Sequence, residues 1–96
     1  MASHQPKEIA IKIGEELMRG AYANTLLVAH SAEEFVLDFV LSLPPQPVCT
    51  ARVIVSPGHL KRIVGALREN LARYEKVHGP VREVAEPDSK RIGFEN

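Results

Sequence analysis

The stretch at residues 22–55, YANTLLVAHSAEEFVLDFVLSLPPQPVCTARVIV, decides the fold of this chain. It holds three runs rich in β-branched and aromatic residues, which favour strands, at residues 22–30, 34–42 and 48–55. The break at 31–33 is short, and the break at 43–47 contains three prolines, which cannot donate to a strand ladder. Breaks of this length join antiparallel neighbours, so the stretch predicts a three-strand meander.

The strand registers are predicted from the residues that flank each break. The simplest registers pair His30 with Glu34, and Ser42 with Val48. Large side chains of the central strand then alternate with small ones of its neighbours on one face. The second register also places Asp38 opposite Arg52, so we expect an ion pair on the other face.

That other face also carries aliphatic side chains, which we predict to form a dimer or partner interface: Leu26, Val28, Val36, Val40 and Ile54. One helix covers one face of a sheet, and a monomer rarely exposes a cluster of aliphatic side chains. A second copy is therefore the favoured cover. The alternative is a fourth strand at residues 8–13, where Ile9, Ile11 and Ile13 alternate, closing a sandwich-like monomer.

A helix is predicted at residues 57–77. Ser56 is a favourable N-cap and Pro57 suits the first helical position, while Gly79 suits the end. Its apolar residues fall within an arc of roughly 100°: Leu60, Ile63, Val64, Leu67, Leu71 and Tyr74. The predicted fold class is α+β, an antiparallel β-meander of three to four strands followed by one C-terminal amphipathic helix that packs on it.

The 96 residues fit one domain, and 45% apolar with 25% charged residues is an ordinary globular composition. We expect a flexible tail at 1–7, a single domain at 8–79 and a loosely ordered tail at 80–96. Residues 15–19, between two glycines, are expected to form a turn or one helical turn. The formal net charge of zero lacks the basic excess of a dedicated nucleic-acid binder and permits self-association.

The predicted location is the cytoplasm. Cys49 is the single cysteine, so no disulfide framework can form within the chain. The first residues lack the apolar segment of a signal peptide, and no apolar run approaches the roughly 18 residues of a membrane span.

No catalytic, metal or cofactor site is predicted. The four histidines form no zinc-type spacing with other ligands. Cys49 falls opposite Leu41 in the simplest register and is expected to be a small buried side chain. Glu34 and Asp38 are about 13 Å apart along a strand, too far to act on one bond.

Several motifs together resemble a family of short bacterial proteins, the domain of unknown function DUF3467. They are Tyr22-x-Asn24, Val28-x-His30-Ser31, EFVLDF at 34–39, Ser56-Pro57 with Lys61-Arg62, and Ala66-Leu67-x-Glu69-Asn70 with Tyr74-Glu75. The resemblance implies a bacterial source and no assigned activity. It also draws attention to Asn70, which lies at the edge of the apolar arc and is expected to hydrogen-bond a strand backbone or a partner. Tyr22 and Asn24, which share a strand face, are expected to do the same.

We therefore predict a non-enzymatic homodimeric interaction or adaptor module, which leaves room for an unidentified protein partner. A nucleic-acid-associated regulator is the alternative, and an enzyme of unknown type is the third hypothesis. The alternative uses basic helix residues that alternate with Glu69 and Glu75: Lys61, Arg62, Arg68, Arg73 and Lys76.

Overall fold

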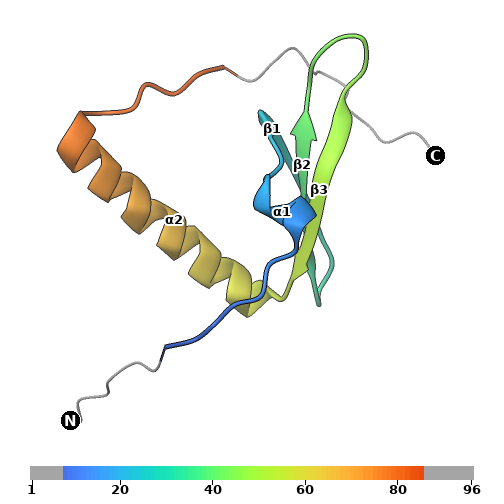
Figure 1. Ribbon diagram of the computed structural model, residues 1–96, viewed down its shortest axis with the longest axis horizontal. Helices are drawn as coiled ribbons and strands as arrows, with labels where there is room; N and C mark the ends of the chain where they lie inside the picture. Colours follow the sequence, from blue (N-terminus) through green and yellow to red (C-terminus); the bar gives the residue numbers. More distant parts are fainter. Residues whose placement is uncertain (1–7, 86–96) are drawn as a thin grey trace.

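The computed structural model describes residues 8–85 and contains one three-strand sheet and two helices (Figure 1). In chain order the elements are α1 (Glu15–Met18), β1 (Thr25–His30), β2 (Phe35–Leu41), β3 (Val48–Val55) and α2 (Pro57–His78). The strands are antiparallel in the order β1-β2-β3. The predicted α+β meander with its C-terminal helix is confirmed. The tail predictions for residues 1–7 and 86–96 lie outside the described residues.

The predicted N-terminal strand is absent from the described residues. Residues 8–14 have no regular structure, and Ile9, Ile11 and Ile13 are all exposed, Ile11 at 83%. Alternating side chains alone do not make a strand, because the backbone needs a ladder partner, and neither edge of the sheet pairs with this segment. The single helical turn predicted next to it is confirmed as α1, where the Met18 amide donates to Gly14 at 3.0 Å.

The second hairpin has the predicted register over most of its length. Asp38 lies opposite Arg52, and the pairing continues in step from Phe35 to Phe39. A β-bulge between Phe39 and Val40 then shifts the register by one. Beyond it Cys49 lies opposite Val40 and not opposite Leu41, so that part of the prediction is wrong.

The first hairpin differs from its predicted register by one residue. His30 pairs with Phe35, because Glu34 belongs to the turn. The Ser31 hydroxyl accepts hydrogen bonds from the amides of Glu33 and Glu34 at 3.2 and 3.3 Å, and the Ser31 amide donates to the Glu34 carbonyl at 2.9 Å. Serine closes turns in this way through its side chain, which lengthens the loop from three residues to four.

This shift moves every β1 side chain to the opposite face from the one predicted. We call one side the phenylalanine face; it carries Leu26, Val28, His30, Phe35, Leu37, Phe39, Ala51, Val53 and Val55. The other, the aspartate face, carries Thr25, Leu27, Ala29, Val36, Asp38, Val40, Cys49, Arg52 and Ile54.

Helix α2 begins and ends at its predicted caps. The Ser56 hydroxyl accepts from the His59 amide at 3.2 Å, Pro57 occupies the first turn, and Gly79, at φ +90°, follows the last turn. Figure 1 shows α2 leaving the sheet at the end of β3 and diverging from it. The expected packing of this helix over the meander is therefore wrong for most of its length: only the neighbouring strands contact each other extensively.

Candidate interaction surface

Within a single copy, residues 8–85 bury very little apolar surface. Among the described residues, Leu37 and Val40 are the only large hydrophobic side chains that are fully buried, whereas nineteen are exposed. A folded domain needs its apolar core to offset the conformational entropy of its chain. Two buried aliphatic side chains are far too few, so the exposed apolar side chains form the candidate functional surface of this molecule.

The five side chains predicted as an interface do not share a face, because the β1 register is shifted. Leu26 and Val28 are exposed on the phenylalanine face, and Ile54 is exposed on the aspartate face. Val36 is half-buried, and Val40 is 1% exposed within a single copy. Val40 is thus already in the core and cannot contribute surface, while the part played by the other four in an interface stays a prediction.

Helix α2 offers the longest continuous apolar surface. Leu60 and Ile63, near its start, are half-buried, but the rest of the arc is exposed: Val64, Leu67, Leu71 and Tyr74. Leu67, at the middle of the helix, is 66% exposed. The sheet of the same chain therefore covers only the first turns of the helix.

The expected ion pair is present on the aspartate face. Arg52 binds Asp38 with two hydrogen bonds, from Nε to Oδ1 at 2.6 Å and from Nη2 to Oδ2 at 3.0 Å. Asp38 is 4% exposed. The hydrogen bond from Arg52 lowers the pKa of the Asp38 carboxyl, although burial acts in the opposite direction. The pair lets a charged residue occupy the centre of the sheet.

Cys49 is exposed and lies on the aspartate face, so the prediction of a buried side chain is wrong. The bulge is the reason, since it turns Cys49 toward Asp38. Its thiol lies 3.9 Å from Asp38 Oδ1 and 3.5 Å from the Ala51 carbonyl, both of which are hydrogen-bond acceptors. These two contacts give the Cys49 thiol a structural role as a hydrogen-bond donor, and its position can be explained without a reactive role.

Asn24 hydrogen-bonds a strand backbone through its side chain, as expected from its motif. Its Oδ1 accepts from the Ser42 amide at 2.8 Å, and its Nδ2 donates to the Ser42 carbonyl at 3.3 Å. Its backbone amide donates to Val40 at 3.0 Å. The side-chain amide thus continues the β1–β2 ladder by imitating a peptide, and the Tyr22-x-Asn24 motif was the signal for it.

Asn70 forms a different contact from the one expected. Its Nδ2 donates to the Ala66 carbonyl of the same helix at 2.9 Å, not to a strand. The side chain is exposed and lies beside the apolar arc. A contact with a partner stays a prediction.

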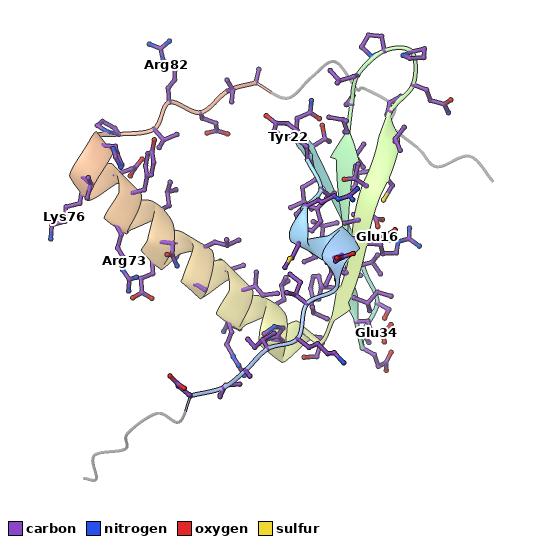
Figure 2. The ribbon with its side chains drawn as sticks, viewed as in Figure 1. Glu16, Tyr22, Glu34, Arg73, Lys76 and Arg82 are labelled. Carbon is purple, nitrogen blue, oxygen red and sulfur yellow. The ribbon has the colours of Figure 1, made fainter. Side chains whose placement is uncertain are left out.

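The basic side chains of α2 do not form one uninterrupted stripe. Arg73 is paired with Glu69 at 3.0 Å, and Figure 2 shows Arg73 and Lys76 on the side of the helix away from the sheet. Lys61 and Arg68 lie on the flank of the apolar arc instead. The nucleic-acid hypothesis stays a prediction without a specific feature in its favour.

The described residues contain no group of three or more histidine, cysteine or acidic side chains arranged to hold a metal ion. Within the same residues, no helix combines the length and apolar character needed to cross a membrane.

The family model of DUF3467, described as proteins of unknown function, matches residues 1–83. The match spans most of the chain. The class of protein is therefore an α+β family of unknown function. The chain belongs to the DUF3467 family. No match was found among curated proteins or among solved structures.

Proposed function

We propose that this chain is a non-enzymatic homodimeric interaction module whose folded unit is completed by a second copy. The observation that carries the proposal is the imbalance between two fully buried large hydrophobic side chains and nineteen exposed ones among residues 8–85. Burial of apolar surface is the main favourable term in folding, so a lone copy lacks most of the stabilisation that a domain needs.

The exposed apolar side chains are spread over several elements of the chain. They occur on α2, on both faces of the sheet and in the segment before β1, so one partner could cover several of them together. Obligate homodimers resemble a domain core cut in half and are more apolar than transient interfaces.

A second copy is favoured over a strongly charged partner by the charge of the chain. The formal net charge is zero, with twelve basic and twelve acidic residues, so two copies have little net repulsion. A homodimer would leave the polar side of α2, with Arg73 and Lys76, for an adaptor contact (Figure 2).

Sedimentation equilibrium over nanomolar to micromolar concentration tests the proposal. We expect twice the 10.6 kDa chain mass at micromolar concentration, and loss of helical circular dichroism when dilution dissociates the dimer. A folded, cooperative monomer at micromolar concentration would overturn the proposal.

A further inference from the structure

The apolar arc of α2 contains a regular heptad spacing. Apolar or aromatic residues follow one another at alternating steps of four and three along the 22-residue helix: Leu60, Val64, Leu67, Leu71, Tyr74 and His78. Steps of this kind keep side chains on one seam and are typical of helices that pack along each other. At 100° per residue the six lie within about 80° over a helix of about 33 Å. We call them the α2 seam.

The α2 seam faces the side on which the sheet lies but is not covered by it. Arg73 and Lys76 point to the far side of α2 in Figure 2, and the seam lies opposite them on the helix. Leu71 and Tyr74 are nevertheless about half exposed. Leu67, which lies nearer to the start of the helix, is more exposed still. An element from outside residues 8–85 must therefore cover the seam if it is to be buried.

The two flanks of the seam differ in character. One flank carries charged residues one heptad apart: Lys61, Arg68 and Glu75. The other flank carries Ile63, Asn70 and Val77. Opposite charges sit at the two ends of the first flank, and apolar side chains sit at the two ends of the second. Each flank is therefore complementary to itself when the direction of the helix is reversed.

We propose that α2 packs antiparallel against α2 of a second copy about a two-fold axis that crosses the seam midway between Leu67 and Leu71. This inference rests on the proposed homodimer and names the contact that holds it. Leu67 then faces Leu71 of the second copy, twice, at the centre of the seam. Lys61 meets Glu75 of the second copy at one end of the charged flank, and the two-fold axis repeats this ion pair at the other end.

The other flank fits the same axis. Ile63 meets Val77 of the second copy, and Asn70 meets its own counterpart on the two-fold axis. Asn70 already donates one Nδ2 hydrogen to Ala66, which leaves a second hydrogen and Oδ1 to exchange with the opposite side chain. The one unfavourable pairing is Arg68 with its counterpart, and long arginine side chains can direct their charge to solvent.

A parallel pair of helices has no such complementarity. It would place Ile63 beside Arg68 of the second copy and would bring none of the opposite charges of α2 together across the seam. Glu75 can take part in the antiparallel pair, because the Val81 amide donates to Oε2 at 2.9 Å and the carboxylate has a second oxygen. Charge complementarity therefore selects the antiparallel direction.

Charge reversal tests this pairing with the full chain. Lys61→Glu and Glu75→Lys each convert both ion pairs into repulsions, so each variant alone should dimerise roughly ten-fold more weakly than the wild type. In a mixed dimer one copy carries acidic side chains at positions 61 and 75 and the other carries basic ones, so both contacts join opposite charges. The mixture should form heterodimers about as tightly as the wild type dimerises.

The readout is the amount of untagged Glu75→Lys chain retained by affinity-tagged Lys61→Glu chain, together with sedimentation of the mixture. If the single variants unfold, recovery of helical circular dichroism on mixing gives the same answer. Lys76→Glu, on the far side of α2, is the matched control and should dimerise like the wild type. It should also fail to recruit the Glu75→Lys chain preferentially.

Three results separate the possible failures. A dimeric wild type whose variants show no preference for each other overturns the antiparallel helix pair and leaves the homodimer in place, with α2 packed on the sheet of the second copy. A wild type that is a folded monomer overturns the proposed function and this pairing together. Preferential heterodimers with a neutral Lys76→Glu control support the pairing.

Discussion

The sheet and helix α2 of this chain differ in how far their polar groups are paired and their apolar side chains are buried. The sheet pairs its central charge through Asp38 and Arg52, continues its ladder through Asn24, and buries Val40. Helix α2 is capped at both ends and carries one ion pair on its surface, but most of its apolar side chains contact solvent. The sheet thus pairs its central polar groups within one chain, although apolar side chains such as Leu26, Val28 and Ile54 stay exposed on it, whereas the helix is complete only in its backbone.

This difference separates two kinds of stabilisation. Hydrogen bonds and caps act locally, whereas burial of apolar side chains needs a second surface. A substitution in the sheet should therefore change the stability of each copy, and a substitution on the α2 seam should change the association of copies. Variants in each region test that division.

The largest effect is expected for Leu67→Asp. A carboxylate at the centre of the seam would have to be desolvated in both copies, which costs several kcal/mol for each buried charge, so dimerisation should weaken at least about 100-fold. Sedimentation equilibrium measures the dissociation constant. Lys76→Asp, on the polar side of the same helix, should leave it unchanged, and equal affinity of Leu67→Asp and wild type would show that the seam is not buried.

The next largest effect is expected at Asp38, and it depends on pH. Because Arg52 lowers the pKa of Asp38 in the folded chain, the ion pair stabilises the fold above the unfolded pKa of about 3.9. That stabilisation is lost as the pH falls through the lower, folded pKa. Asp38→Asn should therefore lower the urea midpoint at pH 7 and converge with the wild type at strongly acidic pH.

The exposed pair Glu69–Arg73 provides the control for this measurement. Both side chains are largely solvated, so Glu69→Gln should hardly alter the midpoint or its dependence on pH. A pH profile for Asp38→Asn that stays parallel to the wild type down to pH 2 would contradict a stabilising role for the ionised carboxylate.

Local sequence signals predicted much of the fold. Ser56-Pro57 and Gly79 located the ends of α2, because caps and helix-compatible φ angles are properties of a few adjacent residues. The residues flanking the second break predicted the register of β2 and β3, and the opposite charges of Asp38 and Arg52 agreed with it. In each case the signal and the structure that it predicts involve the same residues.

The failures have physical reasons of another kind. The Ser31 hydroxyl lengthened a turn by one residue, and Thr50, whose hydroxyl lies 3.1 Å from the Phe39 carbonyl and 3.2 Å from that of Tyr22, stands at the bulge. The longer turn and the bulge each depend on one side-chain oxygen, and neither is visible in the pattern of hydrophobic residues. Since a one-residue change moves side chains to the opposite face, the predicted interface was divided between the two faces.

A moderate effect is expected for Asn24→Ala. It removes two hydrogen bonds to Ser42 and leaves the amide of a buried residue unsatisfied, which should cost about 1–3 kcal/mol of unfolding free energy. Asn24→Asp keeps the oxygen that accepts from the Ser42 amide and should cost less. Urea unfolding at constant chain concentration measures both, and equal loss in the two variants would assign the effect to the Nδ2 donor instead.

The smallest effect is expected for Gly65→Ala, and its sign is opposite. Gly65 lies inside α2, away from the seam, and a Cβ placed there meets nothing within 4 Å. Alanine should therefore raise the unfolding free energy by about 0.5–1 kcal/mol through its better helix propensity. Because this gain is local to the helix, the dissociation constant should change only as far as dimerisation is coupled to helix folding. Urea unfolding with sedimentation of the same samples separates the two quantities. If Gly65→Ala prevents dimerisation while α2 remains helical, the second copy packs against the side of α2 that carries Gly65, and the seam is not the contact.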